Sequence, residues 1–370
     1  MRFILKIIIF VLNLIFALMK LLPVQNKVTF ISRQSDDKSE DMELVEAELI
    51  KRAPQIKLVF LCKKLEGNPA HKAAYCFHVA RQMYHIATSK AVVLDSYCIA
   101  VSVLKQRKSL VVIQMWHALG ALKRFGLSIV GEDEGSSRAL AESMAMHKNY
   151  TCVLASGRAC APHFAQAFGY DEDSIRVMTL PRVDRLTDPE FARQTAARVR
   201  REYPQLENKK VVVYAPTFRK GRDISADVNG LAEKFDGDEY IFVLKKHPLM
   251  KEKCDGCLTD EKFSTLEMLF AADYVVCDYS AVIFEAAILK KPMFFYAFDY
   301  DAYGAARDFY IDYMKEMPGV ISADPSDIAE AIKKDDYDLA RIDEFSHKFV
   351  EKQENCAADL AEMIIEMTAK

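Results

Sequence analysis

Two histidines follow apolar runs in this 370-residue chain, at positions where a side chain could act as a base or hold a phosphate. Trp116 and His117 come directly after residues 110–115, and His247 follows a second apolar run and two lysines, Lys245 and Lys246. Histidine titrates near neutrality, so His117 could take a proton from an attacking hydroxyl. His247 and the lysines could neutralise a diphosphate. A histidine bonded to neighbouring backbone and a solvated charge run are the alternatives.

A strand-to-helix turn and an arginine offer further contacts for phosphate. Ser280 is placed to cap the helix that follows residues 274–277, and the unpaired N–H groups of such a helix suit a pyrophosphate. The turn lacks the glycine-rich fingerprint of dinucleotide folds, which argues against a Rossmann dehydrogenase. Arg219, shortly after the run 211–214, could clamp phosphate oxygens with both edges of its guanidinium. Ordinary helix capping and a surface arginine are the alternatives here.

The elements that position these residues alternate between β-branched runs and helical stretches, which predicts parallel sheets of βαβ units. Ligands of such sheets bind outside the carboxyl ends of the strands, where His117, His247 and Ser280 stand. The polar stretch 187–208 separates two halves, so we expect two doubly wound, Rossmann-like α/β domains that face a cleft. The expected strands are 28–32, 57–61, 91–94, 110–115, 151–154, 211–214, 240–244, 274–277 and 293–296, and the expected helices are 42–52 with Asp41 as N-cap, 70–88, 191–203, 281–289 and one near Leu266.

The first segment of the chain predicts contact with a membrane. Residues 3–22 are almost wholly apolar and long enough to cross a bilayer. Lys6, Asn13 and Lys20 recur at intervals of seven, so they share one stripe of a helix. The stripe favours a helix in the membrane interface, with these residues at the headgroups, and a spanning helix with snorkelling lysines is the alternative. No small-residue cleavage site follows, which argues against a signal peptide, and Pro23 ends the helix.

Composition excludes several classes of protein. An apolar fraction of 51% and a charged fraction of 28% are ordinary for a globular chain, whose length favours two domains. A net charge of −3 gives no case for nucleic acid. The 9 cysteines form no paired framework, which suits a reducing compartment. Cys254 and Cys257 form a CxxC without further ligands at zinc spacing, and no carboxylate cluster requires a metal, so we predict no metal site.

Short motifs in order along nearly the whole chain resemble the CDP-glycerol glycerophosphotransferase family, the teichoic-acid primases and polymerases. Each motif alone is weak, but their order and spacing make the resemblance specific. They read LLP at 21–23, QMWH at 114–117, AFGY at 167–170, PRVD at 181–184, YAPTFR at 214–219, HP at 247–248, CDYS at 277–280, KPMFFY at 291–296 and DFY at 308–310. The chain departs from the common pattern with WHALG at 116–120 in place of WHGTP, with Glu285 in place of an aspartate, and with Asp308 in place of a glycine.

The resemblance implies a GT-B-like fold with a membrane-associated helix at 1–23, an acceptor domain at 24–190 and a CDP-donor domain at 191–370. It implies that His117 is the catalytic base for attack on the β-phosphorus of CDP-glycerol or CDP-ribitol, with CMP as the leaving group. Donor phosphates would contact His247, Ser280, Arg219, Asp278 and Tyr279, and the acceptor side of the cleft would include Trp116, Lys123 and Arg182.

The implied partners are a CDP-polyol donor, a lipid-linked or polymeric polyol-phosphate acceptor, and lipids at the cytoplasmic face of a bacterial membrane. No nucleic acid and no firm cofactor are implied, and a divalent ion on the diphosphate is left open. A GT-B glycosyltransferase that uses a nucleotide-diphosphate sugar would share the fold but release a nucleoside diphosphate. A non-catalytic scaffold should lack His117 or His247, and both are present. Glycerol against ribitol, primase against polymerase, and the acceptor stay undecided.

Overall fold

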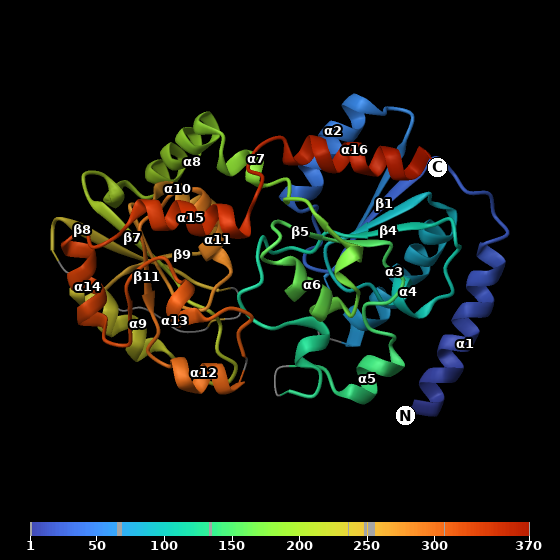
Figure 1. Ribbon diagram of the computed structural model, residues 1–370, viewed down its shortest axis with the longest axis horizontal. Helices are drawn as coiled ribbons and strands as arrows, with labels where there is room; N and C mark the ends of the chain where they lie inside the picture. Colours follow the sequence, from blue (N-terminus) through green and yellow to red (C-terminus); the bar gives the residue numbers. More distant parts are fainter. Residues whose placement is uncertain are drawn as a thin grey trace. The chain divides into compact units, whose positions relative to one another are not determined.

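The computed structural model describes residues 2–64, 69–132, 135–235, 237–247, 250, 256–306 and 308–369. The chain divides into two compact units (Figure 1). Unit 1 comprises residues 1–118, 124–182 and 355–370, and unit 2 comprises 119–123 and 183–354. The expected border at 190 and 191 therefore differs from the observed division. The physical reason is packing, because the last helix and the short segment 119–123 each join the unit that buries their apolar side chains.

Unit 1 is built on a six-stranded sheet in the order β2-β1-β3-β4-β5-β6, in which all pairs are parallel. Strands β1, β3 and β5 are buried along their whole length. Strands covered on both faces are continuous apolar runs, which is why five of the six were predictable. The sixth, β6, has only three residues, and two of them are exposed. The strands are β1 (Lys27–Ser32), β2 (Lys57–Cys62), β3 (Ala91–Leu94), β4 (Val111–Gln114), β5 (Cys152–Ala155) and β6 (Ile175–Val177).

The helices of unit 1 confirm the expected ones and correct one cap. Helix α2 (Glu40–Arg52) begins after Ser39, whose Oγ accepts a hydrogen bond from Met42 N (3.4 Å), so the expected N-cap at Asp41 is wrong. The last helix, α16 (Cys356–Ala369), packs beside α2 although the two lie at opposite ends of the sequence (Figure 1). The other helical segments are α3 (Pro69–Thr88), α4 (Ile99–Val103), η1 (Gly126–Ile129), α5 (Arg138–Ser143), α6 (Ala161–Phe168) and η2 (Glu172–Ser174).

Helix α1 (Arg2–Met19) docks on unit 1 through the polar stripe that the sequence assigned to lipid headgroups. Asn13 Nδ2 donates to the carbonyl of Val103 (3.1 Å), and Asn13 Oδ1 accepts from the N–H of Lys105 (2.8 Å). Lys20 Nζ donates to the carbonyl of Lys105 (2.7 Å), and Phe16 is buried. The expected orientation is therefore wrong for Asn13 and Lys20. Backbone groups at the end of α4 need hydrogen-bond partners, and these two side chains supply them.

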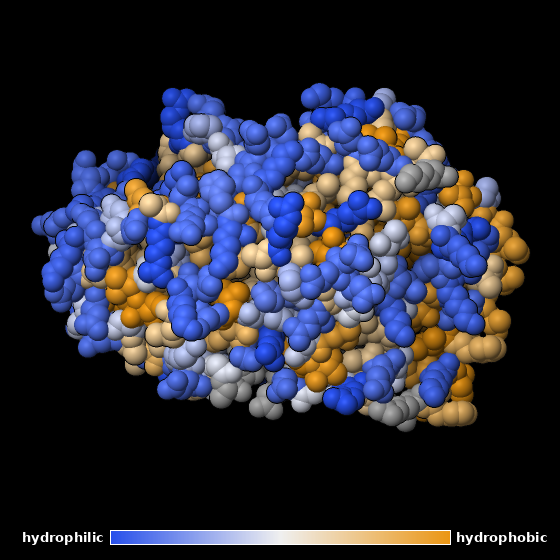
Figure 2. Space-filling model, viewed as in Figure 1, coloured by the Kyte–Doolittle hydropathy of each residue, from blue (hydrophilic) through white to orange (hydrophobic). Residues whose placement is uncertain are grey.

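The opposite side of α1 is an exposed apolar surface. We call this surface the α1 face. In Figure 2 apolar side chains gather along the right-hand edge, where Figure 1 places α1. No helix among the described residues is both long and apolar enough to cross a membrane. The α1 face consists of Phe3, Ile4, Ile7, Ile8, Phe10, Val11, Leu14, Ile15 and Leu18, and it continues into Leu21, Leu22 and Val24.

Unit 2 contains a second six-stranded parallel sheet, in the order β12-β11-β10-β7-β8-β9. Its four central strands confirm the expected ones, whereas the two edge strands have only two or three residues and gave no apolar run. The strands are β7 (Lys210–Ala215), β8 (Tyr240–Lys245), β9 (Leu258–Asp260), β10 (Tyr274–Cys277), β11 (Met293–Tyr296) and β12 (Ile321–Ser322). The helical segments are α7 (Val183–Leu186), α8 (Pro189–Glu202), η3 (Pro204–Leu206), α9 (Ser225–Ala232), η4 (Glu233–Phe235), α10 (Thr265–Ala271), α11 (Val282–Ile288), α12 (Tyr300–Ala306), α13 (Tyr313–Glu316), α14 (Pro325–Lys333) and α15 (Leu339–Phe349).

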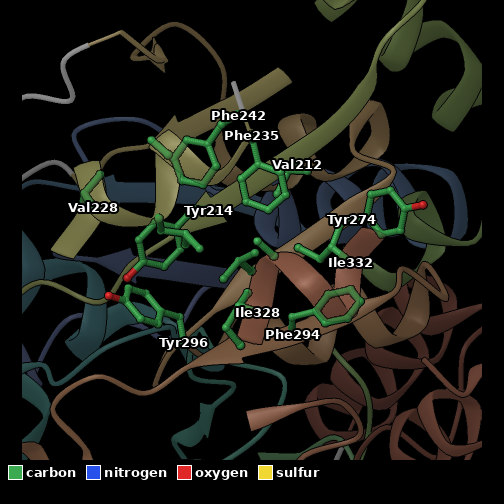
Figure 3. Close-up of a cluster of buried hydrophobic side chains, with 14 of the residues drawn as sticks. Val212, Tyr214, Val228, Phe235, Phe242, Tyr274, Phe294, Tyr296, Ile328 and Ile332 are labelled. Carbon is green, nitrogen blue, oxygen red and sulfur yellow. The ribbon is translucent and has the colours of Figure 1, made fainter. Parts of the chain in front are cut away.

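A buried aromatic and aliphatic cluster fixes the carboxyl end of β7. Figure 3 shows side chains from α9 and α14 packed against one face of the sheet. Tyr214, the penultimate residue of β7, has its ring centroid 6.2 Å from that of Tyr296 and 6.1 Å from that of Phe242. Since the chain leaves the sheet directly after Tyr214 and Ala215, this packing holds the start of the loop that follows.

Residues 119–123 separate two stretches of unit 1 but pack within unit 2. Leu119 and Leu122 are buried there, and the carbonyl of Leu122 accepts a hydrogen bond from the N–H of Tyr310 (3.0 Å). A Cβ added at Gly120 would lie 2.3 Å from the ring of Phe284, so this close approach requires glycine. The peptide immediately after His117 and Ala118 is therefore held by unit 2.

Candidate active site

His117 lies just beyond the carboxyl end of β4, with its Nδ1 2.8 Å from the carbonyl oxygen of Asp95. A carbonyl can only accept, so Nδ1 carries the proton of the neutral ring. The other nitrogen, Nε2, then holds the free lone pair and can accept a proton. The side-chain amide of Gln34 lies 3.1 Å from the same Nδ1, and because Nδ1 donates, the amide must turn its oxygen and not its nitrogen toward the ring. This geometry gives His117 the tautomer that a general base needs.

The surroundings of His117 keep its imidazole uncharged. Desolvation by the surrounding protein lowers the pKa of His117 to about 4, with Arg182 and Arg33 acting in the same direction and the Asp95 carbonyl opposing them. His117 is nevertheless exposed to solvent, and water screens such effects. Both the ordinary value and the lowered one lie below 7, so the ring is neutral at pH 7.

Trp116 turns the chain so that His117 faces Asp95. Its φ of 62° lies in the left-handed region, which bulky residues rarely adopt. The buried Gln114 supports this turn, because its Oε1 accepts from Trp116 N (3.0 Å) and its Nε2 donates to the carbonyl of Ser96 (3.2 Å). The indole ring stacks on Phe125, with centroids 5.1 Å apart. Trp116 was expected on the acceptor side of a cleft, and its contacts here position the base.

Arg182 holds the backbone of His117 from one side. Its Nη2 donates to the carbonyl of His117 (2.9 Å) and lies 2.8 Å from Oδ2 of the buried Asp41. Asp41 Oδ1 also accepts from the backbone N–H of Arg182 (2.8 Å). Arg182 was expected on the acceptor side, and in this structure its guanidinium orders the peptide of the base.

Asp278 is the centre of a buried network in unit 2, at the carboxyl ends of β7 and β10. It accepts from the backbone N–H (2.9 Å) and hydroxyl (2.7 Å) of Thr217 and forms an ion pair with Arg219. The other edge of the Arg219 guanidinium lies 2.9 Å from Asp299 Oδ1. Burial lowers the pKa of Arg219, but the carboxylates outweigh that effect and raise it, so the pair stays charged.

This network engages three residues that the resemblance implied as direct phosphate contacts. Arg219 and Asp278 are buried and occupy each other, so the guanidinium has no edge left to clamp a phosphate. Tyr279 is also fully buried, donates its hydroxyl proton to Asp299 (3.1 Å) and stacks on Tyr303 at 4.2 Å. Buried ion pairs are retained where geometry must be fixed, and here they shape the turns that carry the accessible residues of the same edge.

Ser280 and His247 are the accessible residues at this edge of the second sheet. Ser280 is half-buried, and its Oγ accepts from Val282 N at 3.4 Å. Ala281, not Ser280, is the N-cap of α11, which has only seven residues, so the expected capping role is wrong. His247 is exposed and stacks on Phe218 at 5.7 Å, and partial burial and then Lys123 lower its pKa. Contacts of both residues with a donor stay predictions.

The lysines of this edge divide differently from what the sequence indicated. Lys245 is buried with its Nζ 2.8 Å from Asp260 Oδ2, so the expectation that it neutralises a diphosphate is wrong. Lys246 lies 3.3 Å from a carboxylate oxygen of Glu261. Lys123 was expected on the acceptor side but belongs to unit 2. It donates to the hydroxyl of Tyr303 (3.1 Å), and its charge lowers the pKa of His247. It therefore stands with the residues expected to bind the donor.

Sequence reasoning missed several residues that share one signal. Arg33 and Gln34 follow β1, and Asp95 follows β3, so each is among the first polar residues after a buried strand. Asp299 stands in the same relation to β11. These residues would have been found if every first polar residue after a buried strand had been considered as a candidate, and not only histidines and arginines. In the described ranges no group of three or more histidine, cysteine or acidic side chains could hold a metal ion.

Two parallel sheets with polar residues at the carboxyl ends of their strands make this a two-sheet α/β fold, and the fold is similar to that of GT-B-like enzymes. The structure of the wall teichoic acid polymerase TagF matches 100% of this chain and 98% of that one, with a TM-score of 0.76 and 20% identity. A UDP-GlcNAc 2-epimerase from Neisseria meningitidis matches 92% of this chain and 100% of that one, with a TM-score of 0.59 and 12% identity. At these identities the likeness shows the fold alone.

Comparison of amino-acid sequences shows the family to which this chain belongs. The model for CDP-glycerol:poly(glycerophosphate) glycerophosphotransferases matches residues 14–365, and the chain belongs to this family. It is 34% identical to a teichoic acid ribitol-phosphate primase of Bacillus spizizenii, over 92% of this chain and 90% of the relative. A teichoic acid poly(ribitol-phosphate) polymerase of the same organism is 32% identical over 97% of this chain and 59% of the relative. The chain is therefore a CDP-polyol phosphotransferase, as its motifs predicted.

Proposed function

We propose that this enzyme transfers ribitol phosphate from CDP-ribitol to a hydroxyl of a teichoic-acid acceptor and releases CMP. The observation that carries the proposal is the His117 ring, whose Nδ1 proton is fixed by the Asp95 carbonyl so that Nε2 is free to act as a base. Similarity to a ribitol-phosphate primase over nine-tenths of both chains supports ribitol over glycerol. A glycerol-phosphate primase of Bacillus subtilis is 27% identical over 74% of this chain.

The reaction is a direct displacement at the β-phosphorus of the donor. The acceptor oxygen forms a bond to phosphorus while its proton passes to Nε2 of His117. The bond between that phosphorus and the oxygen bridging to CMP breaks, and CMP leaves with the electron pair. A neutral His117 is required for the first event, and the pKa below the ordinary range provides it at pH 7.

Unit 2 supplies the donor contacts in this proposal. The Ser280 hydroxyl and the His247 imidazole stand at the carboxyl ends of β10 and β8, where ligands of parallel sheets bind. The buried Asp278 and Arg219 beneath them hold the Thr217 and Ser280 turns in one geometry. Phosphoryl transfer needs positioning and charge stabilisation more than covalent help, so a rigid support of this kind favours it.

We also propose that α1 attaches the enzyme to the cytoplasmic face of the membrane, where lipid-linked acceptor would be met. The α1 face presents a continuous set of exposed aliphatic and aromatic side chains. Residues 1–26 and 96–110, which contain α1 and the segment on which it docks, have no aspartate or glutamate but six lysines and arginines. An apolar face with basic residues beside it suits an interface of anionic lipid.

The test is a release assay with purified protein, a membrane-derived acceptor, and CDP-ribitol or CDP-glycerol in parallel reactions. We expect CMP from CDP-ribitol in the presence of acceptor, and much less from CDP-glycerol. Release from CDP-glycerol alone would contradict the choice of polyol but keep the reaction. Release of a nucleoside diphosphate from a sugar donor, with no CMP from either polyol donor, would contradict the proposed reaction itself.

A further inference from the structure

Arg33 is a cation beside the base that the proposed mechanism does not use. It follows the last residue of β1, and its backbone N–H donates to Ser96 Oγ (3.2 Å). Its guanidinium lies over the ring of Tyr97, with Cζ 5.3 Å from the ring centroid. Tyr97 is itself held, because its hydroxyl donates to the carbonyl of Met144 (2.9 Å). The next residue, Gln34, has its side-chain amide 3.1 Å from Nδ1 of His117, which places Arg33 beside the base.

The guanidinium of Arg33 lacks an anionic partner in the part of the chain that the structure describes. The residue is half-buried, yet its side chain has no ion pair and no hydrogen bond to those residues. The other arginine beside the base, Arg182, is paired with Asp41. The contact with Tyr97 compensates only part of the desolvation of this half-buried cation, because no carboxylate among the described residues neutralises its charge. Its planar set of donors, placed over the Tyr97 ring, matches the oxygens of a phosphate.

The position of Arg33 selects which phosphate it meets. His117 must contact the attacking hydroxyl, and a polyol-phosphate acceptor carries a phosphodiester one polyol away from that hydroxyl. The residues expected to hold the donor's diphosphate, His247 and Ser280, belong to unit 2, whereas Arg33 belongs to the unit of the base. The anion that Arg33 would meet is thus on the acceptor.

We propose that Arg33 and Tyr97 form an acceptor-phosphate subsite, in which the Arg33 guanidinium binds the phosphate that precedes the attacking hydroxyl. The inference rests on the proposed function, since it names the part of the acceptor that the same site recognises. It means that the enzyme selects acceptors that already end in a phosphate-linked polyol. Free polyols would be poor acceptors because they leave the cation unpaired.

The test compares two soluble acceptors with the same terminal polyol, one as a phosphodiester and one as the free polyol, at saturating CDP-polyol and pH 7.5. Arg33→Gln should raise KM for the phosphodiester acceptor roughly 10- to 100-fold, the size expected for losing a charge-assisted hydrogen bond. KM for the free polyol and for the donor should not change. KM of Arg33→Lys for the phosphodiester acceptor should lie between those of the wild type and Arg33→Gln, since an ammonium keeps the charge but not the planar donors.

The matched control is Arg176→Gln, which removes the same charge from an exposed residue of β6 in the same unit. This variant should leave KM unchanged for both acceptors, and melting curves should show that each variant is folded. An equal effect of Arg33→Gln on both acceptors, or an effect on donor KM alone, would overturn the subsite. If the wild type releases no CMP with either acceptor, the proposed function fails. Calorimetry with glycerol 3-phosphate then still decides the subsite, because equal affinity of wild type and Arg33→Gln would refute it.

Discussion

A general base at cellular pH needs a neutral imidazole with its lone pair aimed outward, and in this chain a backbone carbonyl provides that state. Asp95 contributes its main-chain oxygen, not its carboxylate, to Nδ1 of His117. A carbonyl fixes the tautomer without adding a negative charge that would favour the imidazolium. Arg182, bonded to the carbonyl of His117 itself, adds a positive charge that acts against protonation.

The pH dependence of transfer follows from these contacts. A base is inactive when protonated, so a pKa of His117 lowered to about 4 keeps the enzyme active at lower pH than an ordinary histidine would. We expect kcat/KM for the acceptor to be unchanged between pH 7.5 and pH 6 and to fall only under more acidic conditions. His117→Gln should reduce kcat roughly 100- to 10,000-fold with donor affinity preserved, as calorimetry can check. Half-loss of wild-type activity near pH 6.5 would argue against the lowered pKa.

Gln114 tests whether the left-handed turn at Trp116 positions the base. Gln114→Leu removes the acceptor of Trp116 N and the donor to Ser96 O, and each buried group left unpaired costs about 1–3 kcal/mol. We expect a lower free energy of unfolding in urea titrations and a lower kcat, with donor KM unchanged. Gln55→Leu, at an exposed position, is the control and should do neither. A normal kcat in a destabilised Gln114 variant would leave the residue a purely structural role.

At the scale of elements, sequence patterns predicted buried strands well and the orientation of α1 badly. Parallel strands covered on both faces are apolar throughout, so β3, β10 and β11 match their expected bounds. The edge strands β6, β9 and β12 are too short to give such a run. The polar stripe of α1 was visible, but whether it meets lipid or backbone depends on Val103 and Lys105, which pair with Asn13 only in the fold.

The candidate site shows the same limit. His117 and Ser280 could be placed at strand ends from sequence because position along a βαβ unit fixes the edge. The sequence could not tell which polar residues face a ligand and which face one another. Arg219, Asp278 and Asp299 are about 20 to 80 residues apart and meet only through tertiary packing. A phosphate clamp and a buried ion pair use the same residue types.

The α1 face gives a prediction for membrane binding. Ile4, Val11 and Leu18 share one exposed stripe, with 62%, 45% and 67% of their surface accessible. Replacing all three with serine should abolish sedimentation with vesicles that contain anionic lipid, because the buried apolar area drives such binding. Activity on short soluble acceptors should remain. Asn13→Ala is the matched control, since it removes the docking hydrogen bonds but keeps the α1 face, and it should still sediment.

Deletion of residues 1–22 extends the same test, and it should leave a soluble enzyme active on short acceptors. Vesicle binding that survives both the deletion and the triple serine variant would mean that another surface makes the attachment.

At the scale of the whole molecule, the last helix stabilises the first sheet. Leu360 in α16 is fully buried against unit 1, and Lys90, which precedes β3, donates to the carbonyl of Thr368 (2.9 Å). Leu360→Ala should cost about 2–5 kcal/mol, as buried leucines do. Hydrogen exchange should speed up in peptides covering α2 and β3 and stay unchanged in those covering β7 and β10. Glu366→Ala, at an exposed position of the same helix, should change neither.

The route of the chain past its base has a mechanical consequence. Only Ala118 separates His117 from residues 119–123, which are packed into unit 2, and the chain returns to unit 1 at Arg124. The segment between these two junctions can change its course only through backbone torsions, and the first junction is one residue from His117. The base that is aligned on Asp95 is thus one residue along the backbone from the half of the enzyme that we propose holds the nucleotide.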